Sequence, residues 1–140
     1  MIFQREGAKA EGRKMTENEL SRIIFDSALE VHRTLGGPGL LESVYEEAFC
    51  EELRLRGVVF QRQVALPVVY KGLTLGNPLK LDVVVGNLVI VECKAVEKHN
   101  PVFEAQLLTY LRLRNLKLGM VLNFGQPLMK DGVHRVVNGL

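Results

Sequence analysis

The sequence has little cysteine and no long apolar run, and both absences narrow the classes of protein it fits. Its 140 residues include two cysteines, Cys50 and Cys93, no CxxC pair and three scattered histidines, so a structural zinc site is not expected. No apolar run approaches the roughly 18 residues of a membrane span, and none follows the early basic residues as in a signal peptide. We therefore expect a reduced, cytoplasmic protein without a membrane partner.

A basic excess is also missing from most of the chain. The net charge is +2, and the first 14 residues account for it with four basic and two acidic side chains; the other 126 residues hold 14 of each sign. Nucleic-acid-binding domains usually carry a basic excess, so any nucleic-acid site here must be a local patch. We interpret residues 1–14 as a disordered leader and residues 15–140 as one domain, long enough to bury a core.

Hydrophobic spacing predicts three helices, at about 17–35, 40–56 and 101–115. Thr16 and Glu19 form a capping-box pattern at the start of the first helix. Between and after the helices, extended segments are expected. They lie at 58–72 (with Pro67 marking an edge or a bulge), 79–85, 88–96, 119–125 and, as a short last strand, 132–140. Successive strands without intervening helices indicate an α+β fold with a mixed central sheet flanked by helices.

Three charged residues interrupt the most apolar stretch of the chain, LDVVVGNLVIVECKAV at 81–96. Residues i and i+2 of a strand share a face, so Glu92 and Lys94 lie side by side while Cys93 points into packing. Asp82 stands on the preceding strand. Two carboxylates with nearby backbone carbonyls suit Mg²⁺ or Mn²⁺, and a neighbouring lysine suits phosphodiester hydrolysis by an activated water. A solvated same-face pair of Glu92 and Lys94 is the alternative.

The turn between these two strands decides whether the carboxylates meet. With a two-residue turn at Gly86-Asn87, Asp82 and Glu92 fall on opposite faces of the sheet. A three-residue loop that includes Leu88, or a bulge, brings them to one face. We predict one of these two arrangements.

Two helices supply further candidates for a site. Helical spacing projects Glu42 into an apolar arc of the second helix, where a carboxylate needs a partner or a cation; a place at the positive helix N-terminus is the alternative. Glu52 projects into the same arc. On the third helix, Gln106 and Tyr110 lie one turn apart, and the glutamine either supports a site or faces solvent. The arc consists of Leu41, Val44, Tyr45, Ala48, Phe49 and Leu53.

Two more polar residues fall outside these helices. His99 is a candidate general base or phosphate contact in a polar loop, with a solvated histidine as the alternative. Arg135 interrupts the last strand and is a candidate phosphate contact, with a position at the rim as the alternative.

These residues together resemble the GxxExxY protein family. The segment GLLESVY carries Gly39, Glu42 and Tyr45 in the named places, and Asp82 stands ten residues before the ExK of VIVECKAV. Further agreeing blocks in the same order are LPVVYKG, EAQLLTYLRL and GMVLNFG. The resemblance covers roughly residues 17–138.

The GxxExxY family is placed within the PD-(D/E)XK nuclease-like superfamily, which implies an αβββαβ core, preceded here by an extra helix, and a magnesium-dependent phosphodiesterase site. By that resemblance Asp82 and Glu92 are metal ligands, with the Cys93 carbonyl as a third. Lys94 positions the attacking water. One position departs from the superfamily's pattern: Leu81, directly before Asp82, stands where the pattern PD-(D/E)XK has a proline.

The same resemblance gives roles to the helices. It implies that Glu42 is the helix-borne acidic residue and that Gln106 with Tyr110 forms a supporting motif. We expect Tyr45, Tyr110, His99 and Arg135 to support the site or to contact nucleic acid.

Three functions compete at this point. We expect first a nuclease that uses Mg²⁺ or Mn²⁺ to cut DNA or, less favoured, RNA. A catalytically inactive nuclease fold that binds nucleic acid or protein is the alternative, since the domain is nearly neutral. A regulatory component is the third, because an apolar third helix suits a homodimer or a protein partner.

Overall fold

The computed structural model describes residues 14–140, so the predicted leader lies, apart from its last residue, outside the described residues. The helices are α1 (Glu17–Thr34), α2 (Glu42–Leu55), α3 (Val102–Arg114) and the short 3₁₀ helix η1 (Met129–Gly132). The three predicted helices are confirmed, with ends that differ from the prediction by at most two residues. The strands are β1 (Phe60–Leu66), β2 (Val69–Tyr70), β3 (Leu73–Thr74), β4 (Leu79–Val85), β5 (Val89–Lys94), β6 (Leu118–Asn123) and β7 (Val133–Val137).

The capping box predicted at the start of α1 is confirmed. The Thr16 Oγ1 accepts a hydrogen bond from the Glu19 N–H at 3.2 Å, and the Glu19 Oε1 accepts one from the Thr16 N–H at 2.9 Å. Both donors belong to backbone groups that a helix start leaves without a partner. The local sequence therefore fixes where α1 begins before any tertiary contact forms.

The strands form a mixed five-stranded sheet in the order β1-β4-β5-β6-β7. Strands β5 and β6 run parallel, and the other neighbours run antiparallel. The parallel pair needs a crossover, which α3 provides. The elements α2, β1, β4, β5, α3 and β6 thus follow the expected αβββαβ order, with α1 before them and β7 after them, and the predicted α+β fold is confirmed.

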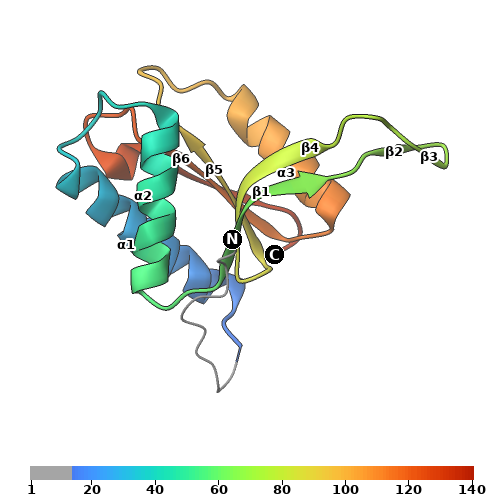
Figure 1. Ribbon diagram of the computed structural model, residues 1–140, viewed down its shortest axis with the longest axis horizontal. Coiled ribbons are helices and arrows are strands. Elements are labelled where there is room, and N and C mark those ends of the chain that lie inside the picture. The colour runs from blue at the N-terminus through green and yellow to red at the C-terminus, as the bar shows by residue number, and fades with distance from the viewer. Residues whose placement is uncertain (1–13) are drawn as a thin grey trace.

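An apolar core lies on each face of the sheet. Helices α1 and α2 cover one face, where Ile24, Phe49 and Leu122 are fully buried, and α3 covers the other with Leu107 and Leu111 (Figure 1). Burying one such side chain contributes about 1.5–3 kcal/mol. Residues 83–85 of β4 and 89–91 of β5 alternate between the two cores, so this strand pair is the centre of the molecule. Leu81 packs in the α3-side core like Val84, so the alternation of β4 breaks at Asp82.

The hairpin between β4 and β5 has a three-residue loop, which is one of the two arrangements that the sequence analysis predicts. Val85 pairs with Val89, which leaves Gly86, Asn87 and Leu88 in the loop. Gly86 and Asn87 have φ of 60° and 59°, a left-handed conformation that glycine and asparagine tolerate best. The length of this loop determines which residues of β4 and β5 stand opposite one another and therefore share a face of the sheet.

The single strand expected over 58–72 is wrong. Strand β1 ends at Leu66, because Pro67 has no N–H with which to continue the ladder. The chain then forms a separate two-stranded ribbon, β2 with β3, that projects from the body as an arm (Figure 1). Val69, Tyr70 and Leu73 are exposed on this arm.

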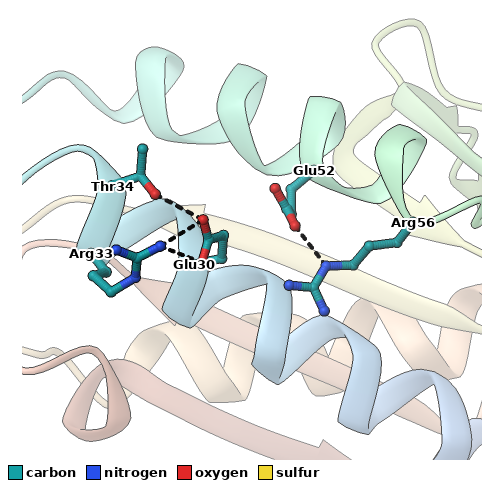
Figure 2. A network of polar contacts seen from close by, with 5 residues as sticks. All are labelled: Glu30, Arg33, Thr34, Glu52 and Arg56. Atoms are coloured by element: carbon teal, nitrogen blue, oxygen red, sulfur yellow. Dashed lines mark hydrogen bonds and ion pairs between the residues drawn. The ribbon is translucent and has the colours of Figure 1, made fainter.

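The facing surfaces of α1 and α2 carry ion pairs at their C-terminal ends (Figure 2). Glu30 accepts from Arg33 at 2.8 Å and from Thr34 at 3.0 Å, and these bonds lower the Glu30 pKa. Glu52, which the sequence projects into the apolar arc of α2, is half-buried and accepts from Arg56 at 2.7 Å. Its carboxylate therefore has a structural partner and belongs to no site.

Within residues 14–140, every helix is too short or too polar to cross a membrane.

Candidate active site

The ladder between β4 and β5 opens at the end opposite the hairpin, and two carboxylates take over its hydrogen bonds. Val83 and Val91 form the last regular pair. Beyond them the Asp82 N–H donates to the Glu92 Oε2 at 3.0 Å, and the Cys93 N–H donates to the Asp82 Oδ2 at 2.8 Å. Each carboxylate is thus held by a backbone N–H of the other strand, and the structure brings Asp82 and Glu92 together as predicted.

Strand β1 opens at the same level on the other side of β4. Its register pairs Arg62 with Val83 and Val64 with Leu81, but no pair joins Gln63 to Asp82. Gln63 has φ of 51°, a left-handed conformation that a strand residue rarely adopts. Asp82 is consequently free of regular pairing on both sides, which gives its side chain access to the end of the sheet.

Burial makes this carboxylate pair hard to ionise. Glu92 is 7% exposed, and its burial, with the nearby Asp82 charge, raises its pKa from 4.5 to about 8. Burial also raises the Asp82 pKa, to about 6, against the lowering effect of the Cys93 N–H. Lys94 lowers both pKa values by its charge, but burial outweighs it. A cation beside the pair would remove most of this cost.

Lys94 follows the pair on β5 and points to the α3 side of the sheet. Its Nζ lies 4.7 Å from the centroid of the Phe103 ring, a cation–π distance. The two residues between which it stands, Cys93 and Ala95, pack into the core on the α1–α2 side. The predicted alternation is confirmed: Glu92 and Lys94 share one face, and the Cys93 side chain is buried on the other.

The buried carboxylate of α2 is Glu46, which the sequence analysis missed. It is 4% exposed and accepts hydrogen bonds from Arg62 at 3.1 Å and from the Gln63 side chain at 2.9 Å. Its charge raises the Asp82 pKa more than that of Glu42 does. Glu46 can be recognised as the buried acid of α2 only from its partners on β1, Arg62 and Gln63. No local sequence pattern connects Glu46 to these two residues.

The apolar arc predicted for α2 is wrong at its N-terminal end. Leu41 is 73% exposed, Val44 is 39% exposed, and Glu42 is exposed as the first helical residue. The buried face consists of Tyr45, Glu46, Phe49, Cys50 and Leu53. The first turn of α2 overhangs the open end of the sheet, where there is no apolar surface to meet it. Glu42 is near enough to Asp82 to raise the pKa of that carboxyl.

Tyr45 is a structural residue that holds the loop before α2. Its ring is fully buried and stacks on Phe124 at 4.8 Å between centroids. Its hydroxyl donates to the Gly37 carbonyl at 2.7 Å and accepts from the Leu40 N–H at 3.2 Å. Gly39 lies between these contacts with φ of 119°, which suits glycine alone. The hydrogen bonds of the Tyr45 hydroxyl hold this loop in place, and the loop in turn determines the position of Glu42 at the start of α2.

On α3, Tyr110 lies near the carboxylates and Gln106 does not enter the core. Tyr110 is 9% exposed, and burial together with the charges of Glu92 and Asp82 raises its pKa. Gln106 is exposed. Tyr110 therefore borders the site, whereas the supporting role of Gln106 stays a prediction.

His99 and Arg135 make their hydrogen bonds with residues other than the carboxylate pair, although the His99 ring packs edge-on against Phe103, the ring that also lies beside the Lys94 Nζ. His99 accepts or donates a 2.7 Å hydrogen bond with Glu104 and stacks on His134. Arg135 is exposed, pairs in register with Met120 of the α1–α2 side, and donates to Asn18 of α1. Arg135 thus lies on the face of the sheet opposite Glu92. This place agrees with the alternative given for it in the sequence analysis, a position at the rim.

The donor set at the open end fits a hard divalent cation. Two carboxylates converge there, both with raised pKa values, and magnesium and manganese prefer oxygen ligands of this kind. The Cys93 carbonyl stays a predicted third ligand. The residues that would hold the ion are Asp82 and Glu92, and Lys94 would stand beside it.

The family comparison agrees with this geometry. Residues 18–136 match the family model described as PD-(D/E)XK nuclease superfamily. The chain belongs to this superfamily, whose members are typically metal-dependent. It matches none of the curated proteins and no solved structure.

Proposed function

We propose that this protein is a metal-dependent nuclease that hydrolyses phosphodiester bonds of DNA, with RNA as the less favoured substrate. The observation that carries the proposal is the opened β4–β5 ladder. Backbone N–H groups there donate to Asp82 and Glu92, and burial raises the pKa of both carboxylates. Lys94 lies on the same face of the sheet as Glu92. A structural ion pair would not require two buried acids side by side.

Each group has a role in the proposed reaction. When bound, Mg²⁺ or Mn²⁺ would supply Lewis acidity toward a phosphoryl oxygen and a lowered pKa for water. Asp82, Glu92 and the Cys93 carbonyl would hold the ion. Lys94 orients the attacking water, and the Phe103 ring beneath it fixes the direction of its side chain.

The acidic residues of α2 belong to the same proposal. Glu42 at the first turn overhangs the open end, and its charge reaches Asp82. Glu46 already accepts hydrogen bonds from Arg62 and Gln63, which leaves Glu42 as the helix-borne acid of the site. Its exposed carboxylate is available to the outer coordination sphere of an ion or to a water.

The GxxExxY resemblance is the finer family assignment that we propose. Gly39 and Tyr45 have structural reasons for their places in the motif, since the glycine has a φ of 119° and the tyrosine hydroxyl bridges Gly37 and Leu40. Together they hold the loop that begins α2 at Glu42. In this proposal the motif positions one carboxylate, that of Glu42, at the open end of the sheet.

A cleavage assay with Lys94→Met tests the proposed function. Methionine keeps an unbranched apolar chain over Phe103 but removes the ammonium group. Loss of a positioned proton-transfer or water-orienting group typically lowers a rate by about 10²–10⁴-fold. We expect such a loss on duplex, single-stranded or branched DNA in the presence of Mg²⁺ or Mn²⁺.

Lys98→Met is the matched control, because Lys98 is an exposed lysine four residues further on. Equal activity of Lys94→Met and wild type would refute the mechanism. If the wild type binds DNA without cutting it, the protein is a binding module instead. Phosphate contacts would then appear as a log–log salt slope of about −0.9 per contact on duplex DNA. A homodimer or protein partner stays a prediction.

A further inference from the structure

A second group of metal-ligating side chains gathers away from the carboxylate pair. Among the described residues, His99, Glu104 and His134 offer ligand atoms that all lie within 4.8 Å of one another. They come from three separate places: the loop before α3, the first turn of α3 and the edge strand β7. The sheet register and the α3 crossover bring them together, so no local motif of the sequence reveals the group.

The separations within the group are close to those of a tetrahedral site. The His99 Nε2 lies 2.7 Å from one oxygen of Glu104, and the His134 Nδ1 lies 3.5 Å from the other. Two ligands of a tetrahedral zinc ion, each about 2.0–2.1 Å from the metal, are roughly 3.3 Å apart. The two measured distances fall on either side of that value.

The other nitrogen of each ring is left without a partner. The His99 Nδ1 and the His134 Nε2 do not face Glu104, are buried and have no hydrogen-bond partner, and they are two of four such side-chain atoms among the described residues. They are separate from the ligand set, which consists of the His99 Nε2, the His134 Nδ1 and the Glu104 carboxylate.

The two imidazole rings also lie close together. The rings of His99 and His134 stack with 3.8 Å between centroids. Both histidines therefore stand on the same side of the Glu104 carboxylate, and a neutral imidazole is the form that ligates a metal.

This group is distinct from the carboxylate pair on β4 and β5. In the sheet register Glu92 pairs with Val121, and Val121 pairs with His134. Two interstrand spacings separate the backbones of Glu92 and His134, about 10 Å. The Phe103 ring contacts both groups, since it lies 4.7 Å from the Lys94 Nζ and 5.6 Å from the His99 ring.

From this geometry we propose that His99, Glu104 and His134 bind a zinc-class divalent cation at a site separate from the Asp82–Glu92 centre. Two imidazoles and one carboxylate suit Zn²⁺ and similar late transition ions, whereas Mg²⁺ prefers oxygen. Three protein ligands leave a fourth position for water or an anionic oxygen. Because the ligands come from the loop before α3, α3 and β7, the bound ion would tie the edge strand to the helix.

A zinc titration by calorimetry tests the proposal in a chain that carries Asp82→Asn and Glu92→Gln. These changes remove the strand carboxylates as alternative ligands, and the buried thiols, whose pKa burial raises, are poor competitors. We expect one equivalent of Zn²⁺ to bind. Adding His134→Gln or Glu104→Gln should weaken binding by more than about 100-fold, because even a partner behind a ligand is worth 10–100-fold.

Asp131→Asn is the control, since it removes an exposed carboxylate outside the cluster and should leave the affinity unchanged. Circular dichroism verifies that each variant is folded, and the visible spectrum of bound Co²⁺ gives an independent readout of the ligand set. Absence of zinc binding in the carboxylate-free background would overturn the proposal. So would unchanged zinc affinity in the folded Glu104→Gln protein. Neither result bears on magnesium-dependent cleavage at the other site.

Discussion

The two ends of the β4–β5 pair are built from the same two strands and have opposite properties. At the hairpin end, Val83, Val84 and Val85 pair with Val91, Ile90 and Val89, and each of these side chains is at most 1% exposed. At the open end, carboxylates replace backbone carbonyls as hydrogen-bond acceptors. The closed end stabilises the fold, and the open end carries an electrostatic cost that a bound cation would relieve.

This difference teaches how a small domain supports a strained site. The valine-rich pairs fix the strand register, and the register alone determines that Asp82 and Glu92 meet. No flexible loop is required, because both proposed ligands stand on strands of the central sheet. Sites on such rigid elements are positioned more accurately than sites on loops.

The largest effect should come from Glu92→Gln at the open end. The change removes a charged ligand but keeps the size of the side chain. Cleavage activity with Mg²⁺ should fall by at least about 100-fold, because losing a ligand costs more than the 10–100-fold of a supporting group. A rate measurement on DNA checks this, and full activity of the folded variant would contradict the assignment.

At the closed end, Ile90→Ala should act on stability instead. Ile90 is fully buried against the α3 core, and deleting its methyl and methylene groups costs about 2–5 kcal/mol in unfolding free energy. Urea denaturation measures the loss. Magnesium affinity of the remaining folded protein should be close to that of wild type; a joint loss of both would mean that the two ends are not separable.

Tyr45→Phe tests the loop that presents Glu42. The change removes a hydroxyl that bonds to Gly37 and Leu40 but keeps the ring on Phe124. We expect a destabilisation of about 1–2 kcal/mol, since the buried backbone groups lose a partner. Chemical denaturation provides the value, and a neutral substitution would show that the loop is held by other contacts.

Measured per pH unit, the smallest effect should be a pH-dependent gain in stability in Glu92→Gln. The folded protein keeps a proton on Glu92 between its ordinary pKa of 4.5 and about 8, whereas the unfolded chain loses it. Stability of the wild type therefore falls as pH rises through this window. Without divalent cations, the variant should become more stable relative to wild type as pH rises from 5 toward 8, by up to about 1.4 kcal/mol for each pH unit, and the difference should level off above pH 8. Parallel stability curves would contradict the raised pKa.

Much of the fold could be predicted because its signals are local. Thr16 with Glu19 marks the start of α1, and the hydrophobic spacing predicts α3 nearly to the residue. The parity argument at Gly86-Asn87 predicted a three-residue loop or a bulge, and the structure has the loop. In each case a short segment contains both the pattern and its cause.

The rest of the site depends on contacts between distant segments. Glu46 finds its partners Arg62 and Gln63 only after α2 packs on β1. The exposure of Glu42 follows from the end of the sheet beneath it, which a helical projection does not contain. His134 reaches His99 through the register of β5, β6 and β7. A one-dimensional pattern carries none of this information.

The most direct test of the metal centre is a calorimetric titration of Mn²⁺ into the wild-type protein and into an Asp82→Asn/Glu92→Gln double variant, both with a non-cleavable DNA ligand present. Our account predicts saturable Mn²⁺ binding in the wild type that strengthens as pH rises toward 8, because protons must leave the two carboxylates. The variant should bind no Mn²⁺ at this centre. Equal Mn²⁺ binding by both folded proteins would contradict the account.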